Sequence, residues 1–186
     1  MAKVIKKISI RLRQKIYKII HRVNYRYYLT HYPRLLRKMG INFSGDIKNT
    51  GFISSTVSFD SFDYAKYITI GEHTIISSDV QMLVHDYTIG NAMLALNRGD
   101  VKIGNLPHFI KEIKIGNYCF IGMRSMILPG TEIGDNSIVA AGAVVKGKFP
   151  PNSIIAGNPG KVIMSTDEFV DRHMEKQDYI LRRKES

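Results

Sequence analysis

The sequence predicts a mainly β fold, a parallel β-helix of stacked triangular coils with helices at both ends of the chain. Two observations carry this prediction: aliphatic residues recur at every sixth position through two long stretches, and small residues follow most of them. A period of six fits neither an α-helix, with about 3.6 residues per turn, nor a simple alternating strand. It fits a coil whose flat faces each use six residues, one aliphatic side chain per face pointing inward.

The clearest repeat runs through the C-terminal half of the chain. Steps of six there meet only β-branched residues: Ile115, Ile121, Ile127, Ile133, Val139 and Val145. The residues that follow them are mostly small, which lets the chain turn a corner without a clash. A second series upstream consists of Ile41, Ile47, Ile53 and Phe59, then, after a slip of phase, Ile70, Ile76 and Met82. The alternative is an ordinary β-sandwich, but its turns usually recur at about 8–12 residues.

Three segments fall outside the repeat. Residues 1–40 form a basic helical arm, in which a helix is predicted over 4–24 and a short second helix is opened by Pro33 and closed by Gly40. The β-helix domain covers 41–163 and contains a long irregular insertion at 86–112. The C-terminal segment covers residues 164–186, and a helix is predicted in it over 165–184. The apolar stripe of the first helix comprises Ile5, Ile8, Leu12, Ile16, Ile19 and Val23, and the capping box Ser165-x-x-Glu168 opens the last helix.

Composition excludes several classes of protein. The chain has 186 residues, 44% hydrophobic and 23% charged, which is typical of a soluble globular protein. No apolar run reaches the roughly 18 residues needed to cross a bilayer. Lys and Arg interrupt the apolar residues at the start, which argues against a secretory signal peptide. Cys119 is the single cysteine, so no internal disulfide can form, and we expect a cytoplasmic protein.

The net charge of +11 belongs to the N-terminal arm. Residues 1–40 hold twelve Lys and Arg and no acidic residue, and the remainder carries fifteen basic against sixteen acidic side chains. Two interpretations of the arm stay open. In the first, its apolar stripe caps the end of the coil stack. In the second, residues 1–24 lie on the inner face of a membrane. Because the rest of the chain is near neutral, specific nucleic-acid binding is not expected.

Three motifs follow one another in residues 113–163. The pattern I-x-I-G-x-x-x-x-I-G runs from Ile113 to Gly122, P-G-x-x-I-G-x-x-S-x-[IV]-x-A-G from Pro129 to Gly142, and A-G-x-P-x-[KR]-x-I from Ala156 to Ile163. Together they resemble the closing coils of the sugar O-acetyltransferases in the hexapeptide-repeat acyltransferase superfamily, of the galactoside, maltose, xenobiotic and capsule types. The resemblance implies a left-handed β-helix, acetyl-CoA as co-substrate, and a homotrimer with shared active sites.

The resemblance does not cover the whole chain. Residues 1–40 and the insertion lie outside it, and three positions inside it depart from the family pattern. Phe120 stands where Trp is common, Met123 where Ser or Ala is common, and Lys146-Gly147-Lys148 where Thr-Lys-Asp is common. Because the long insertion would lie near the acceptor, neither the acceptor nor the acetylated position follows from the sequence.

Acetyl transfer from a thioester needs a base that takes the proton of the attacking hydroxyl, and His suits this near neutral pH. His85, in the sequence VHDYT, ends a coil strand and begins the insertion, where the resemblance places the general base. Asp86 and His108 are expected to contact the acceptor, with His108 as the reserve base. Asp86 is not expected to orient the His85 ring, because adjacent strand residues point to opposite faces.

The resemblance also implies the contacts to acetyl-CoA. Small residues lie against the pantetheine arm and a basic residue meets the phosphates, the set being Met123, Ala141, Gly142, Lys146 and Lys161. The sequence has no paired His, Cys or Asp spacing of the kind typical of a metal site, so no metal is expected.

These predictions describe an acetyl-CoA-dependent O-acetyltransferase for a saccharide of a surface polysaccharide or glycolipid. An N-acetyltransferase for an amino sugar stays open, because His85 suits both reactions. A non-catalytic β-helix scaffold or binding protein is the second alternative, because a fold does not fix a function.

Overall fold

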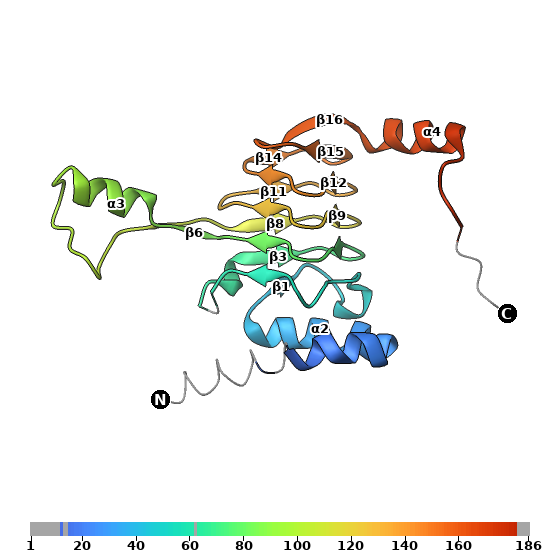
Figure 1. Ribbon diagram of the computed structural model, residues 1–186, viewed down its shortest axis with the longest axis horizontal. Coiled ribbons are helices and arrows are strands. Elements are labelled where there is room, and N and C mark those ends of the chain that lie inside the picture. The colour runs from blue at the N-terminus through green and yellow to red at the C-terminus, as the bar shows by residue number, and fades with distance from the viewer. Residues whose placement is uncertain (1–11, 13–14, 62, 182–186) are drawn as a thin grey trace.

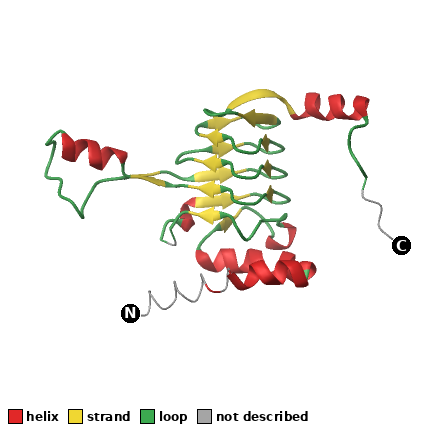
Figure 2. Cartoon of the chain, in the orientation of Figure 1, coloured by secondary structure: helices red, strands yellow, loops and turns green. Residues whose placement is uncertain are grey.

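The computed structural model describes residues 12, 15–61 and 63–181. Residues 41–84 and 111–156 wind into a stack of coils, called the coil stack below, in which short strands line three flat faces (Figure 1, Figure 2). The first face holds β1 (Asn42–Phe43), β3 (Ile68–Ile70), β8 (Ile113–Ile115), β11 (Glu132–Ile133) and β14 (Lys148–Phe149). The second face holds β2 (Ser58–Phe59), β5 (Gln81–Met82), β10 (Met126–Ile127) and β13 (Val144–Val145).

The third face contains β4 (Ile75–Ile76), β9 (Phe120–Ile121), β12 (Ile138–Val139), β15 (Ser153–Ala156) and β16 (Lys161–Ser165). Strand β16 pairs antiparallel with β15, and the other strand pairs described within the three faces are parallel. Up to β15, consecutive strands of the stack fall on different faces, as a coil with three sides requires. The predicted parallel β-helix is therefore confirmed.

The six-residue period marks the inward column correctly in the C-terminal half. Each of its members is at most 3% exposed: Ile115, Ile121, Ile127, Ile133, Val139 and Val145. Burial of one such side chain contributes about 1.5–3 kcal/mol. In the upstream series Ile47 is the exception, because it lies in the 3-10 turn η1 (Ile47–Asn49) and is only half-buried. The slip of phase falls between Phe59 and Ile70, where the structure places η2 (Ala65–Tyr67) directly before β3.

Small residues at the corners are required by the close spacing of successive coils. A Cβ atom at Gly122 would come within 2.5 Å of the backbone N of Ala141 in the next coil. At Gly134 the same atom would come within 2.4 Å of the backbone N of Pro151. A side chain at either corner would therefore push two coils apart.

Two helices cover the lower end of the stack in Figure 1. Residues 15–23 are helical, and α2 (Tyr25–Met39) follows. Asn24 caps α2, its side-chain oxygen accepting from the N–H of Tyr27 at 3.0 Å, and Gly40 ends it in the left-handed region with φ of 108°. The expectation that Pro33 opens this helix is wrong, because the cap lies upstream and Pro33 is inside α2, whereas Gly40 is confirmed as its end. The part of the first helix predicted over residues 4–11 lies outside the described residues.

The arm covers the stack, but not through the predicted stripe. The buried side chains of α2 are Tyr28, Tyr32, Pro33, Leu35 and Leu36. From the first helix, Tyr17 and Ile20 pack against this core. The stripe residues Ile16, Ile19 and Val23 instead face away from it and are 46, 65 and 81% exposed. Periodicity identified an apolar face correctly, but another face of the same helix meets the stack.

The insertion is more regular than predicted. β6 (His85–Asp86) pairs antiparallel with β7 (Phe109–Ile110), and α3 (Thr88–Ala95) lies between them. These residues, 85–110, form a projecting loop that carries α3 away from the stack (Figure 1). The expectation of a wholly irregular insertion is therefore wrong.

The C-terminal helix α4 (Thr166–Lys176) leaves the opposite side of the stack from the projecting loop (Figure 1). Its predicted start is confirmed, since the Ser165 hydroxyl accepts from the N–H of Glu168 at 3.0 Å. The helix ends at Lys176, earlier than the predicted residue 184, where Gln177 takes a left-handed conformation. Among the described residues, none of the helices has the length and hydropathy required to cross a membrane.

Candidate functional site

His85 stands where the chain leaves the coil stack. Val84 still points into the core and is fully buried, while the next residue begins β6 of the projecting loop. The His85 side chain is 25% exposed, so it is held by neighbours yet open to a small molecule. This corner, at the junction of the second and first faces, also receives the residues that follow β2, β10 and β13.

Asp60 fixes the His85 ring from the neighbouring coil. Its carboxylate is 2% exposed, and its Oδ2 lies 2.7 Å from Nδ1 of His85. The same oxygen accepts from the backbone N–H groups of Val84 at 2.8 Å and His85 at 3.3 Å. Because an ionised carboxylate can only accept hydrogen bonds, Nδ1 of a neutral His85 carries the proton. Nε2 is then left with its lone pair, as a general base requires.

Aromatic rings surround His85, and one of them, Tyr64, also contacts His108. The Tyr64 ring stacks on His85 at 4.8 Å between centroids, and the Tyr87 ring meets its edge at 5.4 Å. Tyr64 Oη lies 3.1 Å from Nε2 of His108, whose ring is 6.5 Å from that of His85. A hydrogen bond with Tyr87 is the largest of the effects that raise the pKa of Tyr64, so this phenol stays protonated at neutral pH. Asp60, Tyr64, His85, Tyr87 and His108 are called the histidine cluster below.

Asp86 points to its own backbone rather than to the His85 ring, as the sequence predicted. Its Oδ1 accepts from the N–H of Thr88 at 2.8 Å, at the start of α3. The hydrogen bonds to Thr88 lower the pKa of Asp86, and the charge of Lys146 lowers it further. Lys146, which follows β13, therefore acts on the same corner. The structure thus brings His108 to His85 and places Lys146 within electrostatic reach of Asp86.

The other residues predicted to contact the cofactor lie elsewhere. Met123 follows β9, and Ala141 and Gly142 follow β12 in the next coil, all at the junction of the third and second faces. The Gly142 N–H donates to the Met123 carbonyl at 2.8 Å. A Cβ at Gly142 would meet nothing within 4 Å, and Met123 is 45% exposed, so the three form an open ledge. Lys161 is exposed on β16, beyond the ledge toward the end of the stack.

Three members of the histidine cluster escaped the sequence prediction: Asp60, Tyr64 and Tyr87. A signal existed for Asp60, since it directly follows Phe59 of the inward series. The equivalent places after Met82 and Ile127 hold leucines. A carboxylate where the neighbouring coils hold leucines, directly before the slip of phase, indicates that this Asp side chain has a polar partner. Neither tyrosine stands out from the ten in the chain.

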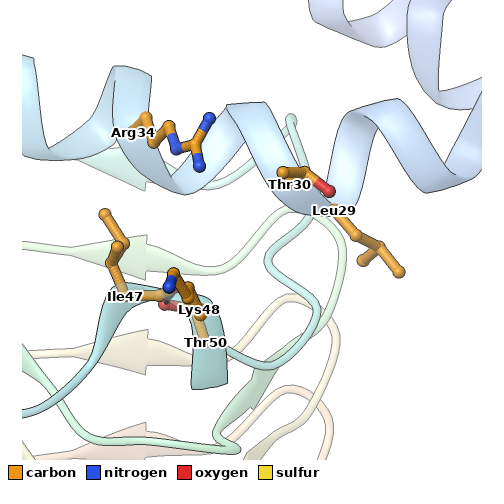
Figure 3. A pocket seen from close by; sticks show the side chains of 6 residues that line it. All are labelled: Leu29, Thr30, Arg34, Ile47, Lys48 and Thr50. Atoms are coloured by element: carbon orange, nitrogen blue, oxygen red, sulfur yellow. Dashed lines mark hydrogen bonds between the residues drawn. The ribbon is translucent and has the colours of Figure 1, made fainter.

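A hollow lies between α2 and η1, with a cavity volume of about 280 Å³ (Figure 3). Arg34 lies along α2, and Lys48 belongs to the facing segment. The full lining is Leu29, Thr30, Arg34, Ile47, Lys48 and Thr50. This lining shares no residue with the histidine cluster and offers no carboxylate, imidazole or thiol. Within the described part of the chain, no group of three or more His, Cys, Asp or Glu is placed to hold a metal ion.

Comparison with known proteins places these features in context. The family model for the bacterial transferase hexapeptide, with six repeats, matches residues 112–147. The chain is 37% identical over 144 residues to Protein CapG of Staphylococcus aureus, which covers 77% of each chain. It is 34% identical over 112 residues to galactoside O-acetyltransferase of Escherichia coli K12, covering 60% of this chain and 50% of the relative. The chain thus spans about half the length of several curated relatives that it matches.

Solved structures share the architecture. A galactoside acetyltransferase in complex with coenzyme A superposes with a TM-score of 0.57 at 24% identity, covering 95% of this chain and 90% of that one. A maltose O-acetyltransferase from Clostridium difficile 630 superposes with a TM-score of 0.54 at 20% identity, covering 84% and 87%. The common fold is the left-handed parallel β-helix, which confirms the predicted fold class.

Proposed function

Because the chain belongs to the hexapeptide-repeat acyltransferase superfamily, we propose that it transfers an acetyl group from acetyl-CoA to a hydroxyl group of a saccharide. The observation that carries the proposal is the Asp60–His85 pair, which leaves a lone pair on Nε2 at the entrance of the projecting loop. A relative named galactoside O-acetyltransferase supports a saccharide acceptor. A relative named as a putative lipopolysaccharide biosynthesis O-acetyl transferase supports an acceptor in a surface polysaccharide or glycolipid precursor.

The chemistry follows from this pair. As the acceptor oxygen attacks the thioester carbonyl, its proton passes to Nε2 of His85, and Asp60 stabilises the imidazolium that forms. The attack forms the new C–O bond and gives a tetrahedral intermediate, whose collapse restores the carbonyl double bond and breaks the C–S bond. The proton then passes from Nε2 to the leaving sulfur, which restores neutral His85 and releases CoA as a thiol. The stacked Tyr64 ring restricts rotation of the imidazole during both transfers.

The rings beside His85 suit a saccharide acceptor. Tyr64 and Tyr87 offer apolar ring surfaces for the C–H face of a sugar, and their hydroxyls offer hydrogen bonds. His108 and the Asp86 carboxylate add polar contacts at the same entrance. An amino sugar would fit the same surface, and its neutral amine would use the same base, so N-acetylation is the alternative product.

The position of the ledge supports a shared site. His85 and the ledge of Met123, Ala141 and Gly142 lie at opposite edges of the second face. One face of the coil therefore separates the base from the small residues that would accept the pantetheine arm. We propose a homotrimer in which His85 of one subunit meets the ledge of the next, with Lys146 and Lys161 near the CoA phosphates. The lone Cys119 fits a reducing compartment, and we place the trimer in the cytoplasm.

Release of free thiol from acetyl-CoA, measured with a panel of sugars and amino sugars, tests the reaction. His85→Ala should lower sugar-dependent release by roughly 10²-fold or more, the loss expected for a general base. His73→Ala is the matched control, because His73 is an exposed corner residue stacked on Tyr118. Release with amino sugars alone would support N-acetylation. No release with any acceptor and no acetyl-CoA binding would favour a scaffold.

Complementation tests the shared site. His85→Ala and Gly142→Trp chains should each be inactive as homotrimers, the second because an indole fills the ledge. In mixed trimers, some sites combine His85 from one chain with Gly142 from the other. Activity should therefore return on mixing after reversible dissociation, and light scattering should give the mass of a trimer. Failure to recover activity in confirmed mixed trimers would place both groups in one subunit.

A further inference from the structure

The first helix has two apolar faces, and only one of them is used inside the molecule. Tyr17 and Ile20 pack against the core, with the Tyr17 ring 6.1 Å from Tyr28 and 5.4 Å from Tyr32. The second face consists of Leu12, Ile16, Ile19 and Val23, which are 58, 46, 65 and 81% exposed. Their spacings of four, three and four residues place them in one line along a helix.

Cations flank this exposed line. At about 100° per residue, Lys15, Lys18 and Arg22 project along one side of it, while Tyr17 and Ile20 lie along the other. All three cations are exposed, and residues 1–40 contain no acidic side chain that could neutralise them. The helix therefore presents an apolar line with a positive border, at the end of the stack remote from β16 (Figure 1).

We propose that this face binds the surface of an anionic membrane. Leu12, Ile16, Ile19 and Val23 enter the boundary between headgroups and acyl chains, and the neighbouring Lys and Arg contact lipid phosphates. The short aliphatic line alone gives weak binding, so the charges are needed as a second attraction. Tyr25 and Tyr27, 49 and 44% exposed at the start of α2, suit the same interface.

Charge selects the lipid surface over other occupants of this face. A second copy of the chain would bring its own twelve cations against the first twelve, which repel. An anionic polymer such as a nucleic acid would satisfy the cations but leave the apolar line in water. An anionic bilayer satisfies both features. The inference does not depend on acetyl transfer.

Vesicle flotation tests the inference on the full chain, with phosphatidylcholine alone and mixed with phosphatidylglycerol. The wild type should float with the anionic vesicles, more weakly at high salt. The double variant Ile19→Glu/Val23→Glu should bind at least about ten-fold more weakly, because carboxylates replace two inserting side chains. The triple variant Lys15→Gln/Lys18→Gln/Arg22→Gln should also lose binding.

The matched control is Leu96→Glu/Ile103→Glu, which adds the same charges at two aliphatic side chains of the projecting loop that are 69 and 89% exposed. It should bind like the wild type, and melting curves should show that every variant folds. Negligible wild-type flotation would overturn the inference, as would full binding by either helix variant. Equal loss in the control would move the contact elsewhere. A lower solution mass for the double helix variant would show that a second copy occupies this face.

Discussion

Along the coil stack each strand pairs with a strand of the coil above or below, whereas β6 and β7 of the projecting loop pair only with each other. The inward residues of the stack are almost completely buried, while Leu96 and Ile103 of the loop are 69 and 89% exposed. The stack thus derives its stability from repetition, since each coil buries the next. The loop interrupts that repetition and gains little burial from its own chain.

The histidine cluster spans the boundary between these two regions. Asp60 and Tyr64 come from the slip of phase in the stack, and His85, Tyr87 and His108 come from the projecting loop. The regular part supplies a buried carboxylate at a fixed position, and the interruption supplies partly exposed rings around it. In a repeating fold, candidate catalytic residues are therefore best sought where two interruptions of the repeat lie close together in the structure.

The strongest test of the contrast compares two isoleucines. Ile121→Ala removes a fully buried side chain from the inward column and should lower the free energy of unfolding by about 2–5 kcal/mol. Ile103→Ala removes a side chain that is 89% exposed in the loop and should change it by no more than about 0.5 kcal/mol. Denaturant titration of both variants measures the two values. Similar losses would mean that the loop is as tightly packed, through contacts between subunits, as the stack.

A smaller effect is expected where the two regions meet. Asp60→Asn replaces the acceptor of the Nδ1–H of His85 by an amide, which no longer stabilises the imidazolium. A hydrogen bond to a charged group is worth about 1.5–3 kcal/mol, so kcat should fall by roughly 10- to 10²-fold. The KM for acetyl-CoA should stay unchanged, because the Asp60 carboxylate is only 2% exposed and bonds to His85 and to backbone N–H groups rather than presenting a surface to CoA.

Asp79→Asn is the matched control for this variant, since Asp79 also occupies a coil corner in the left-handed region, with φ of 60°. It is exposed and does not contact the histidine cluster, so kcat should match the wild type. An Asp60→Asn protein with normal kcat would show that Asp60 holds the loop rather than assisting proton transfer. A parallel rise in KM for acetyl-CoA would point to a general distortion of the fold.

The sequence predicted the stack better than the loop for a physical reason. Buried residues recur at a fixed period in the stack, so the sequence predicts the inward column correctly except at Ile47, which is only half-buried. The sequence predicts that His85 and His108 both act on the acceptor, and their rings lie 6.5 Å apart. Asp60 could not be found in this way, since its partner lies in the next coil and the pair depends on how the chain re-enters the stack. The stripe of the first helix shows a related limit: a pattern reveals an apolar face but not what covers it.

A last test of the comparison concerns a thiol that should react slowly. Burial is the main cause that raises the pKa of Cys119, which is 2% exposed, and only the thiolate attacks alkylating reagents. In a Leu96→Cys chain, one cysteine lies in the stack and one in the projecting loop, so a single protein carries both reporters. With iodoacetamide near pH 8, peptide mass spectrometry should find the loop thiol modified on the order of 10²-fold faster.

As the pH rises, labelling of the loop thiol should speed up first, because the pKa of the loop thiol is lower than the pKa of the buried Cys119 thiol. Labelling of Cys119 requires the coils on either side of it to separate, so its rate reports opening of the stack. Denaturant should therefore accelerate labelling at Cys119 much more than at residue 96. Equal rates in native buffer would mean that the stack opens locally at residue 119. The division between a closed repeat and an open interruption would then fail at that coil.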